Sequence, residues 1–336
     1  MQIKLNGARI LITGGTGSWG SALARRILEQ YKPAELIILS RGEVKQVEMR
    51  RTFNNPLLTF VIGDVRDKQR LMTVFQDVDY VFHCAALKHI DVCEANPWEA
   101  VLTNIYGTQN VIEAAIERHV KAVIDISTDK AVDPFNLYGA TKNCGEKLVI
   151  EANFRRTDCR FFCIRGGNVL GTNGSVIPFF KEQIAKQNKI TVTDPKMTRF
   201  LMTIEDAMDL IFEAMYKAHG GEIFVVKMPA FELKELAEVM IKELGNKDTS
   251  ITTLGLRPGE KIDEVLVSKH EARRTVDSGN YFIILPQLRI PDLEKAYEKY
   301  PRVTFEEFNS KIAQRMSKND IFAMLEQNGY LSVTPE

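Results

Sequence analysis

The chain has 336 residues, of which 45% are hydrophobic, so it is long enough to bury a large core. Its 44 acidic and 44 basic residues balance, which excludes an overall field that attracts nucleic acid or an anionic membrane. The five cysteines lack the spacing of a metal site, and no apolar run reaches the ~18 residues of a membrane span. We therefore expect a cytoplasmic protein with reduced thiols, no metal, and neither nucleic acid nor membrane as a partner.

The first half of the chain alternates between strands and helices. Strands are predicted at 8–12, 35–40, 58–62, 79–83, 120–127 and 160–164, and helices at 22–31, 43–53, 98–118 and 138–153. Such alternation gives a parallel sheet with right-handed crossovers and helices on both faces. The predicted fold is therefore α/β, a Rossmann-type doubly wound sheet, with residues 1–165 forming the dinucleotide-binding domain.

Beyond residue 165 the alternation breaks down. Glycine-rich turns follow, then a short strand at 190–192, helices at 204–218 and 231–244, and a loop at 257–260. We expect residues 166–286 to form a smaller substrate lobe, with some later segments returning to the sheet. Residues 287–336 are charged and are predicted to be a helical extension on the outside of the molecule or against a partner.

Three glycines mark the turn between the first strand and the first helix. Gly14, Gly17 and Gly20 are spaced three apart, and backbone N–H groups at such a turn can hold a pyrophosphate at the positive end of the helix. The turn predicts a dinucleotide site. The other residues of this segment expected to line it are Thr16, Ser18 and Trp19.

The end of the second predicted strand indicates which dinucleotide is bound. A site selective for NAD usually has an acidic residue there, to take both ribose hydroxyls. This chain has Ser40 and Arg41 instead, with Lys45 one helical turn later. Two cations favour the 2′-phosphate of NADP, which is the predicted cofactor.

The third and fourth strands complete the predicted cofactor site. Asp64 and Val65 follow the third strand, where the carboxylate can accept a hydrogen bond from the exocyclic amine of adenine. Cys84, Ala85 and Ala86 follow the fourth strand and are small enough for the cofactor backbone to approach closely.

The start of the helix at 138–153 carries a candidate general base. Tyr138 and Lys142 are four residues apart and therefore share a helix face. An ammonium group and a nicotinamide cation would stabilise the phenolate, whose ordinary pKa is near 10. The phenolate could then remove the proton of a sugar hydroxyl while a hydride leaves the same carbon.

These residues carry a resemblance to a known family. The chain resembles the extended short-chain dehydrogenase/reductases and, among them, the inverting UDP-N-acetylglucosamine 4,6-dehydratases of the pseudaminic acid route. The resemblance covers about residues 5–285 and is carried by the segments TGGTGSWG, SRGEVKQ, IGDVRD, AALKH, STDKA, NLYGATK, GNVLG, MTRF and RPGEK.

The resemblance implies a tightly bound, recycled NADP and a role for each catalytic residue. Tyr138 deprotonates the C4 hydroxyl, to which Thr128 hydrogen-bonds, as C4 gives up its hydride. Asp129 acts as an acid and protonates the departing C6 hydroxyl, after which the hydride returns to C6. Lys130 stands where retaining relatives have glutamate, and it takes and returns the proton at C5.

A neutral Lys130 requires a depressed pKa, which we expect from burial and a cation-rich site. The alternative is that Lys130 serves only as an ion-pair partner of Asp129.

The same resemblance implies contacts to a UDP-sugar. Lys88 is expected near both cofactor and substrate, and Asn168, Arg199 and Arg257 near the substrate, while Val169 lines the cofactor. The planar fork of arginine suits phosphate because it donates two parallel hydrogen bonds. A homo-oligomer formed through the helices that flank the sheet is also expected.

One departure from the family pattern leaves the exact reaction open. Where the family often has an aromatic residue, this chain reads Arg165-Gly166-Gly167-Asn168, which is expected to widen the floor beside the nicotinamide. Two alternative activities remain: a split-pathway enzyme acting on a UDP-N-acetylglucosamine-5,6-ene, or a nucleotide-sugar 4-epimerase that leaves Asp129 and Lys130 idle. A non-catalytic NADP sensor is disfavoured by the intact tyrosine and lysine pair.

Overall fold

The computed structural model describes residues 3–155, 157–171, 175–256, 259–290 and 292–331. Its centre is a nine-stranded sheet whose strands run, in spatial order, β14 (Thr275–Asp277), β15 (Tyr281–Ile284), β10 (Ile223–Val226), β6 (Arg160–Gly166), β5 (Ala122–Thr128), β4 (Tyr80–His83), β1 (Arg9–Thr13), β2 (Glu35–Ser40) and β3 (Leu58–Ile62). Neighbouring strands from β3 to β10 are parallel, and β15 is antiparallel to both of its neighbours. The predicted Rossmann-type sheet is confirmed.

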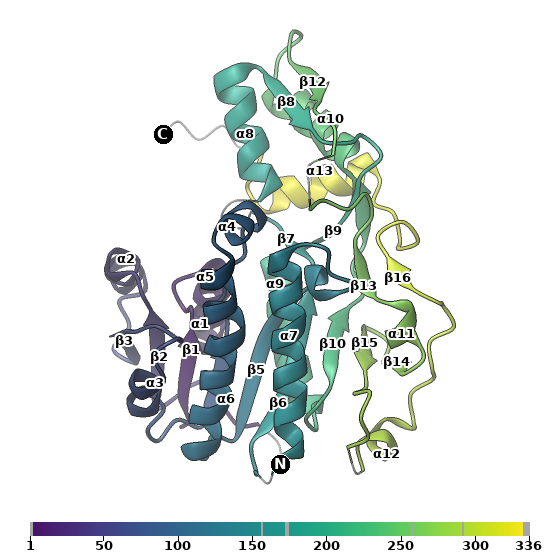
Figure 1. Ribbon diagram of the computed structural model, residues 1–336. Coiled ribbons are helices and arrows are strands. Elements are labelled where there is room, and N and C mark those ends of the chain that lie inside the picture. Colours follow the sequence, from purple (N-terminus) through teal and green to yellow (C-terminus); the bar gives the residue numbers. More distant parts are fainter. Residues whose placement is uncertain (1–2, 156, 172–174, 257–258, 291, 332–336) are drawn as a thin grey trace.

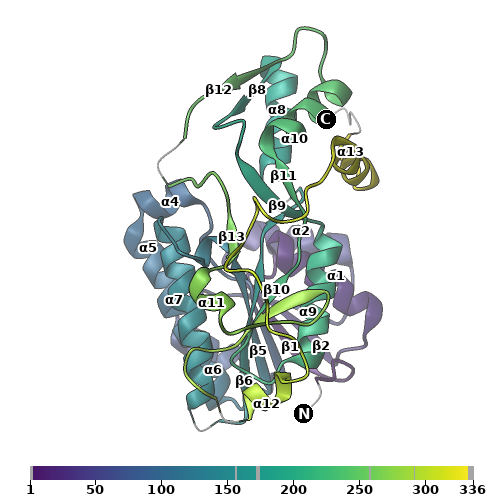
Figure 2. The ribbon, with the colours of Figure 1, turned by 90° about the vertical axis from the view of Figure 1, so that its right-hand side faces the viewer.

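Helices cover both faces of this sheet, as Figures 1 and 2 show. One face carries α5 (Pro97–Val101), α6 (Gly107–Glu117) and α7 (Leu137–Glu151), and the other carries α1 (Ser18–Gln30), α2 (Glu43–Phe53) and α9 (Ile204–Lys217). Because both faces are covered, the strands β1, β2, β4 and β5 are almost entirely buried.

Shorter elements connect these layers. They are α3 (Lys68–Val74), which packs against α6, α4 (Ile90–Ala95), and the short turns η2 (Asp129–Ala131) and η3 (Ala152–Phe154). The helix predicted over 98–118 is interrupted, because a π-helical segment, η1 (Leu102–Tyr106), separates α5 from α6.

A smaller lobe with its own apolar core lies above the sheet in Figure 1. It is built from α8 (Val176–Gln187), β8 (Lys189–Val192), α10 (Leu233–Leu244), β12 (Ser250–Thr253) and α13 (Lys318–Gln327). A three-stranded sheet in the order β11 (Ala230–Glu232), β9 (Thr198–Met202) and β7 (Asn168–Val169) lies between this lobe and the large sheet. Residues beyond 165 thus contribute both to the lobe and, through β10, β14 and β15, to the large sheet.

The C-terminal segment is less helical than predicted. After 286 its described residues form helices only at α12 (Leu293–Tyr297) and α13, with β16 (Phe308–Asn309) pairing antiparallel with β13 (Val265–Val267), which precedes the short helix α11 (Lys269–Ala272). The segment is extended because Phe305 and Phe308 both pack edge-on against Phe282 of β15. It therefore joins the edge of the large sheet to the small lobe.

Among the residues that the structure describes, no helix combines the length and apolar character needed to cross a bilayer.

Candidate active site

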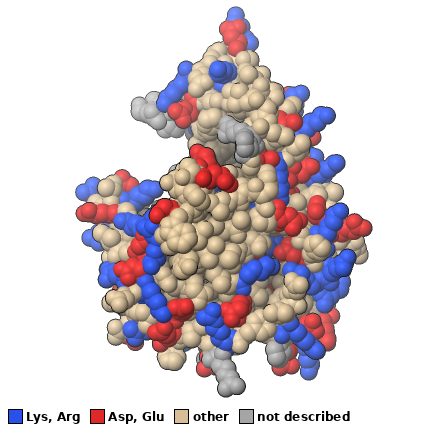
Figure 3. Space-filling model, in the orientation of Figure 1, with Lys and Arg blue, Asp and Glu red and all other residues tan. Residues whose placement is uncertain are grey.

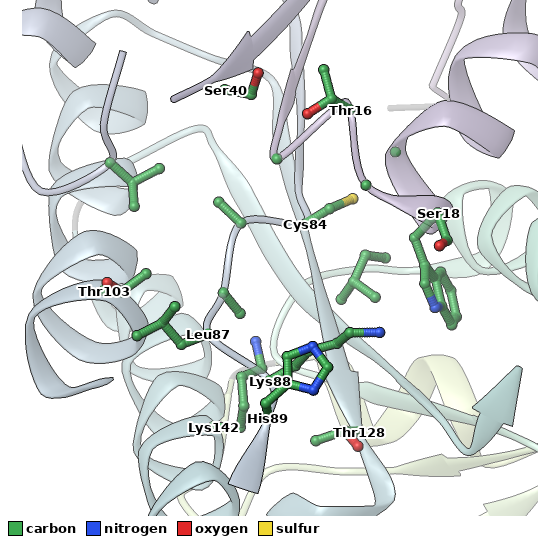
Figure 4. A pocket seen from close by; sticks show the side chains of 18 of the residues that line it. Thr16, Ser18, Ser40, Cys84, Leu87, Lys88, His89, Thr103, Thr128 and Lys142 are labelled. Carbon is green, nitrogen blue, oxygen red and sulfur yellow. The ribbon is translucent and has the colours of Figure 1, made fainter. Parts of the chain in front are cut away.

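A cavity of about 830 Å³ lies at the carboxyl ends of the parallel strands, next to the neighbouring strands β1 and β4. From β1 the chain continues to β2 and β3 on one side, and from β4 it continues to β5 and β6 on the other. Ligands of such sheets bind at the point where the order changes direction. Figure 4 shows that it is surrounded by the glycine turn after β1, the end of β2, the loop after β4 and the start of α7. Every residue predicted to line the cofactor lines this cavity: Gly14, Thr16, Gly17, Ser18, Trp19, Gly20, Ser40, Arg41, Lys45, Asp64, Val65, Cys84, Ala85, Ala86, Lys88, Tyr138, Lys142 and Val169.

The glycine turn fits a dinucleotide because side chains at two of its positions would collide with backbone. A Cβ on Gly14, whose φ is +65°, would lie 2.8 Å from the backbone of Ala85, and one on Gly20 would lie 2.5 Å from Gly15 Cα. The turn leads directly into α1, whose N-cap Gly17 supplies no side-chain hydrogen bond. The first N–H groups of α1 are therefore not capped by that residue and can hold a pyrophosphate.

The end of the cavity that was predicted to hold adenosine carries two arginine side chains around Asp64. Arg66 binds the Asp64 carboxylate with Nε at 2.8 Å and a terminal nitrogen at 2.6 Å, and a terminal nitrogen of Arg41 lies 3.8 Å from the same carboxylate. Burial alone would raise the pKa of Asp64, but the hydrogen bonds from Arg66 and the nearby charges lower it. Asp64 is thus already paired with protein cations, which leaves it less available for the predicted adenine contact.

Lys142 is held by a buried carboxylate that sequence reasoning missed. Its ammonium group lies 3.3 Å from both oxygens of Asp125 on β5, and both side chains are buried. The signal for Asp125 was an acidic residue within an otherwise apolar strand. Burial raises the pKa of Tyr138, against the lowering effects of Lys142, Lys130 and the Thr128 hydroxyl. The phenolate form therefore requires additional positive charge, such as a nicotinamide cation supplies.

A cluster of polar side chains surrounds Lys130, which also lines the cavity. The Lys130 ammonium group donates to Asp129 Oδ1 at 3.0 Å, Asn168 Oδ1 at 3.4 Å and Glu264 Oε1 at 3.3 Å. Thr128 donates to the same Asp129 oxygen at 2.8 Å. Sequence reasoning missed Glu264, which is buried and arrives from the residue before β13.

The expected depressed pKa of Lys130 is wrong. Burial alone would lower this pKa, but the carboxylates of Asp129 and Glu264 raise it. The groups around the Lys130 ammonium were expected to be mainly cations, but the two carboxylates have the larger effect on its pKa. In the free site Lys130 is therefore an ammonium ion, and its proton must leave before it can act as a base.

The two carboxyl groups behave differently. Burial acts to raise the pKa of Asp129, but the Lys130 charge and its hydrogen bonds lower it to about 2. Burial, and then the Asp129 charge, raise the pKa of Glu264 to about 7. The cluster therefore combines an ionised acid, a charged amine and a carboxyl group that holds a proton near neutral pH.

The predicted substrate residues lie around this cluster. A second cavity of about 160 Å³ adjoins the first, and Lys130 and Asn168 line both. Arg199 lines the smaller cavity, with its Nε 3.2 Å from Glu264 Oε1 and its terminal nitrogens donating to backbone carbonyls of residues 198, 261 and 262. The fourth predicted residue, Arg257, lies outside the described residues.

Lys88 faces the large cavity from the loop after β4 (Figure 4). Burial lowers its pKa, and the charges of Lys130 and Lys45 act in the same direction. A bound anion would relieve that repulsion, which suits a site for a diphosphate.

Asn104 of η1 fixes the same loop: its side chain accepts from Leu87 N at 2.8 Å and donates to Leu87 O at 3.0 Å and to Thr141 at 3.0 Å.

The floor beside Gly166 is filled, which corrects the expectation of a widened site. A Cβ on Gly166 would lie 3.1 Å from two atoms of the Trp19 indole, so this ring occupies the space above the glycine. Gly167 is similarly crowded, since its Cβ would lie 2.9 Å from Met228 and 3.0 Å from Phe200. The aromatic surface that the family often places on β6 comes here from the glycine turn.

Comparison with known proteins identifies the family. The family described as polysaccharide biosynthesis protein matches residues 10–286. The chain belongs to this family.

Among its relatives is a UDP-N-acetylglucosamine 4,6-dehydratase (inverting) from Campylobacter jejuni subsp. jejuni serotype O:23/36 (strain 81-176), 45% identical over 295 residues, which is 87% of each chain. A UDP-glucose 4-epimerase from Rickettsia bellii (strain OSU 85-389) is 45% identical over 280 residues, 82% of each chain. The solved structure of Pen from Bacillus thuringiensis has a TM-score of 0.91 and 39% identity, covering 98% of this chain and 100% of that chain. The predicted membership of the extended short-chain dehydrogenase/reductases, close to the inverting dehydratases, is confirmed.

Proposed function

We propose that this protein is a cytoplasmic, NADP-dependent UDP-N-acetylglucosamine 4,6-dehydratase that inverts C5. Its product is a UDP-4-keto-6-deoxy-L-hexosamine for sugars of the pseudaminic acid type. The observation that carries the proposal is the direct contact between Asp129 and Lys130 beside Tyr138 at the end of the cofactor-sized cavity. The 45% identity to a protein named as an inverting dehydratase supports it.

The side chains divide the work of the reaction. When bound, NADP supplies an acceptor and donor for hydride. Tyr138 takes the proton of the C4 hydroxyl, with Lys142 and Thr128 beside it to lower the pKa of the phenol. Transfer of one proton along the 3.0 Å bond from Lys130 to Asp129 produces a neutral amine and a carboxylic acid together. The amine can then take the C5 proton while the acid protonates the departing C6 hydroxyl.

Mass spectrometry after incubation with UDP-N-acetylglucosamine tests the proposal. Loss of one water from the sugar nucleotide is the expected result. The second candidate, a 4-epimerase, is favoured by the relative of that name from Rickettsia bellii, and it would leave the mass unchanged while inverting C4. A split-pathway enzyme would convert only the 5,6-ene sugar nucleotide.

The choice of NADP over NAD rests on Arg41 and Lys45, which line the adenosine end of the cavity. Substituting Arg41→Ala is expected to weaken NADP binding about tenfold, since a hydrogen bond to a charged group contributes about 1.5–3 kcal/mol and this side chain is half exposed. NAD binding, measured by the same titration, should change by less than about threefold. Equal losses for both cofactors would contradict the assignment of Arg41 to the 2′-phosphate.

Association of the chain into a homo-oligomer is proposed through the face of α5, α6 and α7. Figure 3 shows that the middle of this face carries few charged side chains. Exposed Trp98 of α5 and Tyr106 of η1 pack edge-on against each other. Light scattering of the purified protein is expected to give a multiple of the 38.1 kDa chain mass, and Trp98→Glu is expected to reduce it. A monomeric wild-type protein would contradict this proposal.

A further inference from the structure

We infer that Glu264 is a proton reservoir for the Asp129–Lys130 pair, restoring the proton that each dehydration cycle removes from it. The inference rests on the proposed dehydratase function. It goes beyond that function because it assigns a chemical role to a carboxyl group outside the segments that carry the family resemblance.

The geometry places Glu264 in direct contact with the pair. Its Oε1 accepts from the Lys130 ammonium group at 3.3 Å, and its Oε2 accepts from Asn168 at 3.1 Å. Asp129 Oδ2 is buried and has no other donor among the described residues, and the Glu264 carboxyl lies beside it. A single proton held between the two carboxyl groups would give Asp129 Oδ2 a hydrogen bond and would remove the repulsion between two buried negative charges.

The charged groups that face Glu264 come from three elements. Asp129 and Lys130 belong to η2, Arg199 to β9, and Lys261 to the segment before β13. Burial and Asp129 raise the pKa of Glu264, whereas Lys130 and Arg199 lower it, and the balance keeps the proton on Glu264 up to about pH 7. This is the pH range in which a reservoir can both give and regain a proton.

The C-terminal segment fixes Glu264 in this position. Ser310, which is fully buried after β16, accepts from the backbone N–H of Glu264 at 2.9 Å and donates its own to the Glu264 carbonyl at 2.8 Å. The antiparallel pairing of β13 with β16 also attaches the segment that contains Ser310 to the strand that follows Glu264. The C-terminal segment, which was predicted to lie on the outside of the molecule or against a partner, thus holds the carboxyl group against the catalytic pair.

A proton count over one cycle shows why a reservoir is needed. Lys130 first gives a proton to Asp129, and Asp129 passes it to the C6 oxygen, which leaves as water when the C6–O bond breaks. Lys130 takes one proton from C5 and later delivers one proton to C5, so it ends neutral. Tyr138 has gained the C4 hydroxyl proton and must release it. The pair is therefore one proton short, and Glu264 restores it by protonating Lys130 across the 3.3 Å contact. Glu264 then regains a proton from solvent.

Replacing Glu264 by glutamine tests this role, because glutamine keeps the shape and the oxygen that faces Lys130 but holds no exchangeable acid proton. In Glu264→Gln the first turnover should proceed near the wild-type rate. Later turnovers should slow at least about tenfold, less than the ~10²–10⁴ of a group that transfers its proton in the transition state. Rapid-quench measurement should therefore show a burst of one product per site.

Wild-type activity should also fall as pH rises through about 7, because Glu264 then loses its proton, and the variant should lack this decline. Asp263→Asn is the matched control: it removes a carboxylate one residue away that accepts from Thr198 at 2.6 Å, and it should show no burst and retain the decline.

Infrared difference spectra between acidic and alkaline samples supply a readout without substrate. The wild type and Asp263→Asn should lose a protonated-carboxyl band through about pH 7, and Glu264→Gln should lack it. A band retained in Glu264→Gln, or burst-free kinetics with the wild-type pH profile in that variant, would overturn the inference. If the wild type causes no loss of water, the proposed function is wrong. The infrared band would still show independently whether Glu264 holds the proton.

Discussion

Lys130→Ala is expected to lose hydrogen exchange at C5 by a factor of about 10²–10⁴, the usual contribution of a positioned general base. The reason is that the Lys130 ammonium group donates to Asp129, Asn168 and Glu264 together, and among the described residues no other side-chain amine makes these three hydrogen bonds. Deuterium uptake at C5 in heavy water, followed by NMR, measures the effect.

Two observations separate this loss from a general disruption of the site. NADP binding should survive in Lys130→Ala, because the glycine turn that fits the pyrophosphate, with Thr16 and Ser18, lies across the cavity from Thr128, the residue that precedes η2 (Figure 4). Lys130→Arg is the matched control, since it keeps the positive charge between the carboxyl groups but cannot become a neutral base. Wild-type exchange in either variant would remove Lys130 from the C5 step.

Asp129→Asn is expected to slow water loss by about 10²–10⁴ while leaving C4 oxidation in place. An amide can still accept from Lys130 and Thr128, so the local structure should survive, but it cannot pass a proton to the C6 hydroxyl. Stopped-flow absorbance of the reduced nicotinamide, combined with mass analysis of the sugar nucleotide, separates the two steps.

The same variant carries a test of the electrostatics. The Asp129 charge raises the pKa of Glu264, so its removal should lower that pKa and shift the carboxyl infrared band to lower pH. An unchanged band position would show that the two groups do not interact. Unchanged water loss would exclude Asp129 as the acid.

The sequence predicted the parts of the site that depend on local pattern. The glycines at 14, 17 and 20, the tyrosine and lysine at 138 and 142, and the alternation of strands and helices are all short-range signals, and the structure brings these residues around one cavity. The parallel topology then follows from the rule that crossovers are right-handed.

The parts that the sequence did not predict depend on contacts between distant segments. Glu264 meets Lys130 from 134 positions away, and it does so because β13 pairs with a C-terminal strand that has no distinctive pattern. Trp19, from the glycine turn after β1, fills the space above Gly166 of β6, where the family often has an aromatic residue. The error in the pKa of Lys130 has the same origin, because its carboxylate neighbours include one that only the tertiary structure places there.

The NMR spectrum of the product formed from UDP-N-acetylglucosamine in heavy water shows whether Lys130 acts at C5. An inverting dehydratase that uses Lys130 at C5 should give a 4-keto-6-deoxy sugar with deuterium at C5 and ring couplings of the L configuration. A product with the D configuration at C5, or a sugar that has kept its C6 hydroxyl, would exclude an inverting dehydratase.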